Sequence, residues 1–155
     1  MNVIYLHGFR SSAASIKGQL LQQYCEKNPQ IQVHLPDLNM SPVDTIQHMS
    51  ALIESLDNVS LVGSSLGGFY ATHLVAKYSV PAVLINPAMR PWQLFRELFD
   101  DELPLQVHPN WRLDDSHLDQ LEGLALPTAQ DADKILVLLQ QGDEVLDYRE
   151  AHRYY

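Results

Sequence analysis

A short apolar segment that runs directly into a glycine-rich turn constrains the fold of this chain more than any other feature. Residues 59–62 are apolar except for one serine, and Gly63-Ser64-Ser65-Leu66-Gly67-Gly68 follows without a linker. A helical pattern then continues to about Lys77. These residues predict a strand that turns sharply into a helix, because glycines remove the side chains that would collide at such a turn.

Other apolar runs alternate with stretches that carry helical signals. The five strands predicted from these runs cover residues 3–6, 31–35, 59–62, 82–85 and 135–139. Strands that alternate with helices are typical of an α/β fold with a mostly parallel sheet. The sequence therefore predicts one α/β domain over residues 1–155 with about five strands, a normal size for a single hydrophobic core.

Capping residues indicate where the helices begin. Ser11 and Ser12 can cap a helix whose apolar positions are Ile16, Leu20 and Tyr24. Ser41-Pro42 offers both a capping side chain and a proline suited to the first helical position. We expect a last helix to begin near Asp147, which suits a cap better than a catalytic role.

Charge and composition exclude several classes of function. The net charge of −9 argues against a nucleic-acid partner, because phosphate binding needs a basic surface. We expect no signal peptide and no membrane span, since every apolar run is too short for either. The single Cys25 cannot form an internal disulfide, and a cytoplasmic location is therefore expected.

Residues 88–133 form an unusually long connection between the fourth and fifth predicted strands. They contain helix-like pieces at residues 92–99 and 116–121 and both tryptophans of the chain. We interpret them as a helical cap over the active site, with a surface excursion around one crossover helix as the alternative. The cap hypothesis expects a cavity that faces Ser65 and is lined by some of Trp92, Leu94, Phe95, Leu98 and Phe99.

The pattern Gly63-x-Ser65-x-Gly67 is that of a nucleophile elbow, in which a serine sits on a strained turn between a strand and a helix. The N–H groups and the positive dipole end of the following helix point at the site. The strand before this pattern and the helix after it favour Ser65 as a nucleophile over an incidental serine in a glycine-rich turn.

An oxyanion hole needs two N–H donors, and the sequence offers two candidates. One is Leu66, directly after the serine, and the other is Phe9, in the loop after the first strand, where Gly8 permits close approach to a substrate. We expect His7 to orient this loop by hydrogen bonding rather than to act as a base. The acid of a triad should follow a late strand, which favours Asp143.

Five segments in order resemble the YqiA-like small bacterial esterases of the α/β-hydrolase superfamily. They are Tyr5-Leu6-His7-Gly8-Phe9, Leu35-Pro36-Asp37-Leu38, Val62-Gly63-Ser64-Ser65-Leu66-Gly67-Gly68, Ile85-Asn86-Pro87-Ala88 and Gly142-Asp143-Glu144-Val145-Leu146. The resemblance implies a minimal α/β-hydrolase fold and hydrolysis of carboxylic esters, and also of acyl thioesters such as acyl-CoA. It implies a triad of Ser65, Asp143 and a histidine, with no metal or cofactor. Gly8, Asn86 and Arg90 would lie at the substrate, although Arg90 also fits an ordinary surface arginine.

The histidine is where this sequence departs from the family pattern. In the family it lies on a loop after one further strand, so we expect the triad histidine beyond Tyr155 and a C-terminal strand to be missing. His152 lies on the last predicted helix and should face solvent, whereas His108 and His117 in the cap could approach Ser65.

Residues 135–139 independently indicate that a C-terminal strand is missing. They are apolar at every position, like an interior strand, and would leave a hydrophobic edge for a second chain to cover, for example in a homodimer. The alternative function is a non-catalytic binding module that keeps the fold without a complete triad.

Overall fold

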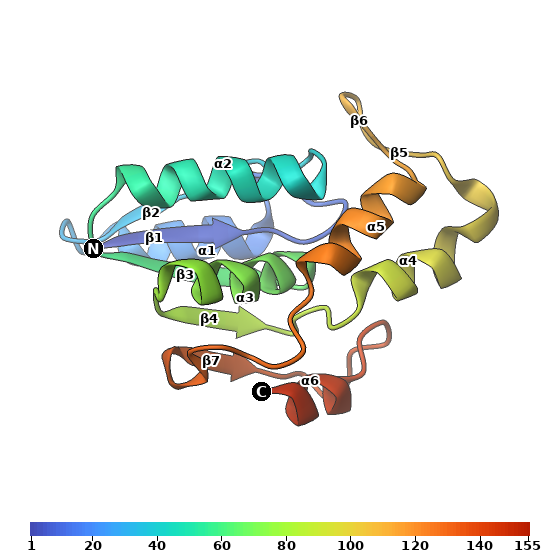
Figure 1. The fold of residues 1–155 in the computed structure, drawn as a ribbon. Coiled ribbons are helices and arrows are strands. Elements are labelled where there is room, and N and C mark those ends of the chain that lie inside the picture. The colour runs from blue at the N-terminus through green and yellow to red at the C-terminus, as the bar shows by residue number, and fades with distance from the viewer.

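The computed structural model describes residues 1–155, in which one five-stranded sheet forms the centre (Figure 1). Its strand order is β2-β1-β3-β4-β7, and every neighbouring pair is parallel. The strands are β1 (Asn2–Leu6), β2 (Gln32–His34), β3 (Val59–Ser64), β4 (Ala82–Ile85) and β7 (Ile135–Leu138). The predicted α/β fold is confirmed, although β2 is shorter and β3 longer than expected.

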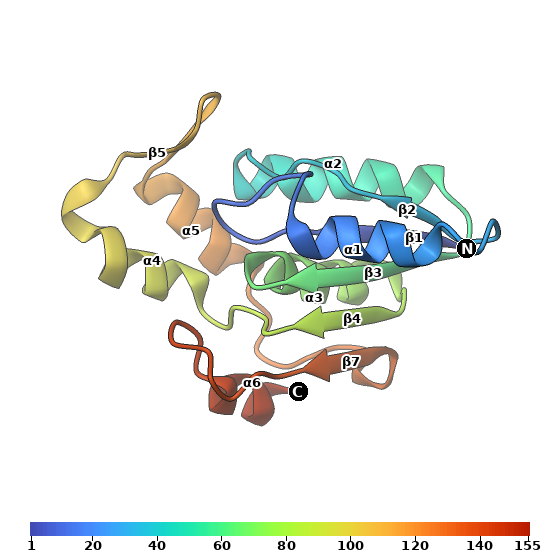
Figure 2. The same cartoon turned by 180° about the vertical axis from the view of Figure 1, so that it is seen from behind.

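Three helices cover the two faces of the sheet. The helix α1 (Ile16–Cys25) lies on one face, while α2 (Pro42–Ser55) and α3 (Leu66–Tyr78) lie on the other (Figures 1 and 2). Ser41 caps α2 as predicted, because its side chain accepts a hydrogen bond from the Asp44 N–H at 3.2 Å. The fully buried core lies mainly under α2 and α3 and includes Met49, Leu61, Leu74 and Leu84.

The prediction for the first helix is wrong in two respects. Its cap is Ser15, whose Oγ accepts the Gly18 N–H, rather than Ser11 or Ser12. Its three apolar positions also face solvent, since Ile16, Leu20 and Tyr24 are 78%, 58% and 83% exposed.

Gly18 is the physical reason for this orientation of α1. A Cβ at Gly18 would lie 3.0 Å from the Tyr5 ring and 3.2 Å from Leu35. The helix therefore packs closely on the sheet through its smallest residue, and its larger apolar side chains point outwards.

A separate group of elements lies beyond the carboxyl ends of the strands (Figure 1). In chain order they are α4 (Pro91–Phe99), η1 (Asp100–Glu102), β5 (Leu105–His108), β6 (Trp111–Leu113) and α5 (Asp115–Leu124). The two predicted helices are confirmed, whereas the antiparallel hairpin of β5 and β6 was not predicted. A short turn, η2 (Ala132–Lys134), then leads back into β7.

The strand β7 occupies one edge of the sheet, followed by α6 (Tyr148–Tyr154) beside it. Ile135 and Val137 pack against the core, but Leu136 and Leu138 are 57% and 49% exposed. The apolar edge expected for these residues is therefore present in the described chain. None of the helices combines the length and the hydrophobicity needed to cross a membrane.

Candidate active site

Ser65 occupies a strained turn between β3 and α3. Its backbone has φ 53° and ψ −118°, a left-handed conformation that is rare for residues with a side chain. The Ser65 N–H donates to the Ile85 carbonyl at 3.1 Å, and the Ser65 carbonyl accepts the Ala88 N–H at 2.9 Å. The turn is therefore held on β4 and on the segment that follows it.

Glycines make this turn possible because three backbone segments meet there. A Cβ at Gly63 would lie 2.5 Å from the Gly67 carbonyl oxygen, and one at Gly67 would overlap the Leu6 carbonyl. A Cβ at Gly68 would meet Pro87 at 2.8 Å. No side chain fits at these positions, which is the steric requirement anticipated for an elbow.

The loop after β1 lies directly against Ser65. A Cβ on Gly8 would be 3.3 Å from the Ser65 Cβ and 3.8 Å from its Oγ. The Phe9 N–H makes no hydrogen bond within the chain. The Leu66 N–H opens α3, where the first amides of a helix have no intrahelical partner. The structure thus brings Gly8, Phe9, Ser65 and Leu66 to one place.

His7 is buried and orients this loop, as predicted. Its Nε2 accepts the Leu38 N–H at 2.9 Å, so Nδ1 carries the proton and donates to the Gly8 carbonyl at 2.9 Å. Nε2 also lies 3.4 Å from the Asp37 carboxylate. Burial raises the pKa of Asp37, but hydrogen bonds from the backbone and side chain of Asn39 outweigh it and hold that pKa below its usual value.

Asn86 joins the end of β4 to the end of β7. Its backbone has φ 43°, its N–H donates to the Leu138 carbonyl at 2.9 Å, and its Oδ1 accepts the Gln140 N–H at 2.6 Å. Asn86 was expected at the substrate, and its Oδ1 is engaged in holding the segment that leads to Asp143.

Asp143 lies in the turn between β7 and α6, partly exposed. Its Oδ1 accepts the N–H groups of Val145 and Leu146, both at 2.9 Å, while its Oδ2 makes no hydrogen bond within the chain. Asp147 caps α6 as predicted, accepting the Arg149 N–H at 2.9 Å. The role of Asp143 as triad acid stays a prediction.

No histidine of the described chain hydrogen-bonds to Ser65. His117 belongs to the capping box that begins α5, and the Nδ1 of His108 accepts the Asn110 N–H in the β5–β6 turn. His73 bonds to the Leu124 carbonyl, and His34 bonds to Asn2. His152 is exposed on α6, as predicted.

The helix α4, which belongs to the segment interpreted as a cap, contacts both the Phe9 loop and α3. Phe95 packs on Phe9, with ring centroids 4.5 Å apart, and Trp92 packs on Phe69 of α3 at 6.1 Å. Trp92 and Phe95 are both buried. Their spacing of three residues puts them on one helical face. Leu98, expected with them, is 53% exposed instead.

Arg90 lies at the start of α4 and forms an ion pair with Glu150 of α6, at 2.8 Å. This partner, 60 residues away in the chain, was not predicted. Both side chains are partly exposed, so Arg90 is not buried in the candidate site.

A protein-family model matches residues 2–155, nearly the whole chain. The chain belongs to the uncharacterised protein family UPF0227, the YqiA-like family. The predicted resemblance is therefore confirmed at the level of the family.

Solved structures similar to this UPF0227 chain share the α/β-hydrolase fold. A putative hydrolase from Agrobacterium vitis matches with TM-score 0.78 and 16% identity, covering 98% of this chain and 72% of that one. Mouse alpha/beta hydrolase domain-containing protein 10 matches with TM-score 0.72 and 16% identity, covering 99% and 74%. Est1E from Butyrivibrio proteoclasticus with bound ferulic acid gives 0.71 and 14%, covering 99% and 74%. At these identities the similarity establishes the fold.

Proposed function

We propose that this UPF0227 chain is a serine hydrolase that cleaves carboxylic esters, and acyl thioesters such as acyl-CoA, through an acyl-enzyme. One observation carries the proposal: the strained Ser65 lies against the Gly8 loop, beside a Phe9 N–H that has no partner. A serine between two unpaired N–H groups has the arrangement that acyl transfer needs.

In the proposed reaction, the Ser65 Oγ attacks the acyl carbonyl while a histidine takes the hydroxyl proton. The N–H groups of Phe9 and Leu66 hold the negative oxygen that forms. The histidine gives its proton to the departing alcohol or thiol, and a water molecule then attacks the acyl-enzyme by the same route. The Asp143 Oδ2, free of other partners, is suited to fix the histidine's tautomer.

The fold comparisons are consistent with this reaction class. Esterases are among the similar structures, and one is a monoacylglycerol lipase from Paleococcus ferrophilus. We propose small or lipid-like acyl compounds as substrates of this chain, in a cytoplasmic protein that needs no metal or cofactor.

A fluorophosphonate probe tests the proposal on the protein as its gene encodes it. We expect one labelled serine, with labelling lost in Ser65→Ala and kept in Ser64→Ala, the neighbouring serine as matched control. Labelling that survives in Ser65→Ala would show that Ser65 is not the nucleophile.

The second candidate is a non-catalytic binding module. It is favoured by one observation, the lack of any histidine bonded to Ser65 in residues 1–155. A folded protein that neither reacts with the probe nor hydrolyses p-nitrophenyl esters, yet binds an acyl compound, would support this alternative.

A further inference from the structure

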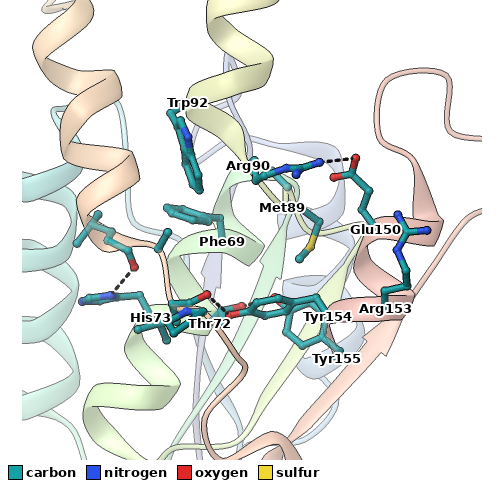
Figure 3. A pocket seen from close by; sticks show the side chains of 15 residues that line it. Phe69, Thr72, His73, Met89, Arg90, Trp92, Glu150, Arg153, Tyr154 and Tyr155 are labelled. Atoms are coloured by element: carbon teal, nitrogen blue, oxygen red, sulfur yellow. Dashed lines mark hydrogen bonds and ion pairs between the residues drawn. The ribbon is translucent and has the colours of Figure 1, made fainter.

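A cavity of about 420 Å³ lies between α3, α4 and α6, and of the residues predicted at the substrate only Arg90 lines it (Figure 3). Its size falls within the range of small-molecule sites, about 300–1,000 Å³. Its lining includes Phe69, Trp92 and Tyr155 but none of Gly8, Phe9, Ser65 and Leu66. The cavity therefore does not open on the Ser65 hydroxyl.

The walls of this cavity are mainly apolar and well ordered by contacts of their own. The rings of Phe69 and Trp92 pack edge to face, and those of Tyr154 and Tyr155 pack at 4.8 Å. Tyr155 and Thr72 hydrogen-bond to each other at 2.5 Å, and Tyr154 donates to the Leu126 carbonyl at 2.9 Å. Burial raises the pKa of the Tyr155 hydroxyl, which therefore stays neutral. The hydroxyls of Thr72, Tyr154 and Tyr155 already have partners in the protein, and an apolar ligand would leave none of these three unpaired.

The rim of the cavity carries three charged side chains, Arg90, Glu150 and Arg153 (Figure 3). Glu150 neutralises Arg90 through the ion pair at 2.8 Å. Arg153 forms no ion pair, which leaves it as the unbalanced charge at the rim of an otherwise acidic protein. An apolar cavity with one unpaired guanidinium at its rim is complementary to an apolar molecule that ends in an anion.

We propose that this cavity binds a monocarboxylate with an apolar body of about eight carbons, with Arg153 pairing with its carboxylate. The available volume holds roughly 14 water-sized atoms at about 30 Å³ each, enough for such a chain and its head group. Glu150 opposes the carboxylate and occupies Arg90, so it lowers the affinity of the site. The site stands apart from the proposed hydrolysis, because binding here needs neither Ser65 nor a triad.

Calorimetric titration of the Ser65→Ala protein with octanoate and with octan-1-ol tests this proposal. The two probes share a chain and differ in charge. We expect octanoate to bind about fivefold more tightly, the scale of one partly exposed ion pair. Arg153→Gln should reduce octanoate to the affinity of octanol, and Glu150→Gln should strengthen octanoate binding severalfold. Neither substitution should change octanol binding.

Matched controls keep the charge change and move it away from the cavity. Arg149 is on the same helix, but its side chain stacks on Tyr148, and Glu144 is exposed and does not line the cavity. The control variants are therefore Arg149→Gln and Glu144→Gln. Both should leave the difference between the probes unchanged. Ala125→Phe, which fills the cavity, should abolish binding of both probes in a protein that still melts cooperatively.

Three results would overturn the proposal: no octanoate binding, equal binding of both probes, or octanoate binding that Arg153→Gln leaves intact. Because all titrations use Ser65→Ala, their outcome is independent of whether Ser65 is a nucleophile.

Discussion

The β1–β3 side of the sheet and the β7 side both contribute to the candidate site, but different forces build them. Around β3 the backbones touch, so that a Cβ at Gly67 would overlap Leu6. At β7 the contacts are polar and near solvent: Asn86 to Gln140, and Asp143 to the two N–H groups that follow it. Leu136 and Leu138 are 57% and 49% exposed, so this edge of the sheet is only partly covered.

This difference separates the two halves of the proposed chemistry. Steric contact holds the serine and the proposed oxyanion donors, and it leaves no room for adjustment. Single hydrogen bonds, each worth about 1 kcal/mol, hold the predicted acid. We infer that substitutions of the glycines around the serine act on the fold, whereas substitution of the predicted acid Asp143 acts on turnover.

Gly67→Ala should have the largest effect. The added methyl group overlaps the Leu6 carbonyl, and neither backbone can move without disrupting the sheet, so we expect a loss above about 4 kcal/mol or no folded protein. Gly123→Ala is the matched control, because nothing lies within 4 Å of its Cβ; in helix α5 it should be neutral or stabilise by up to about 1 kcal/mol. Chemical denaturation measures both. A folded Gly67→Ala protein of normal stability would contradict the steric account.

Asp143→Asn should leave the fold intact and abolish most turnover. Asparagine can still accept the N–H groups of Val145 and Leu146, so the free energy of unfolding should change little. Loss of the charge should lower kcat on the order of 10⁴-fold if Asp143 orients the histidine. Ester hydrolysis by the protein as its gene encodes it is the measurement.

Asp147→Ala is the counterpart of Asp143→Asn. It removes the α6 cap and should cost about 1 kcal/mol of stability with a small effect on kcat. If Asp147→Ala were the variant that lost turnover, the two roles would be reversed.

The elbow was predictable because its requirements are local. Glycines at 63 and 67, a serine between them, a strand before and a helix after are all consecutive in the chain. Ser41 and Asp147 as caps, and the His7 bond to the neighbouring Gly8 carbonyl, depend on equally short-range contacts.

What escaped prediction depends on long-range partners or on weak local signals. Arg90 meets Glu150, and Thr72 meets Tyr155, across 60 and 83 positions of sequence. The β5–β6 hairpin is short and lies among prolines, which weakens any strand signal. The prediction for the first helix was wrong because its apolar positions point to solvent. Gly18, which carries no hydrophobic signal, faces the sheet instead.

Phe95→Ala tests whether α4 is part of the tightly packed β1–β3 side of the candidate site. Phe95 is 5% exposed and packs on Phe9, so its loss should cost about 3 kcal/mol of stability. It should also lower kcat at unchanged KM, because the Phe9 N–H would lose its support. Leu98→Ala, on the exposed face of the same helix, should change neither quantity. Equal kcat in Phe95→Ala and the parent protein would show that the Phe9 loop needs no support from α4.

Leu136→Lys should have the smallest effect on stability and a specific effect on association. Leu136 and Leu20 are almost equally exposed, at 57% and 58%, but Leu136 lies on an edge strand with unpaired backbone groups and Leu20 lies on a helix whose backbone is satisfied. An apolar edge recruits a second strand, and lysine on an edge opposes this pairing.

We therefore expect sedimentation velocity of residues 1–155 to show dimers or larger species that Leu136→Lys reduces and Leu20→Lys does not. Both substitutions should change stability by less than about 0.5 kcal/mol, because both side chains already face water. If Leu20→Lys dispersed the association as well, exposed apolar area would be its cause. If only Leu136→Lys did so, the unpaired backbone of the β7 edge, and not exposed apolar area alone, would cause the association. The β7 side would then differ from the β1–β3 side in its free backbone groups.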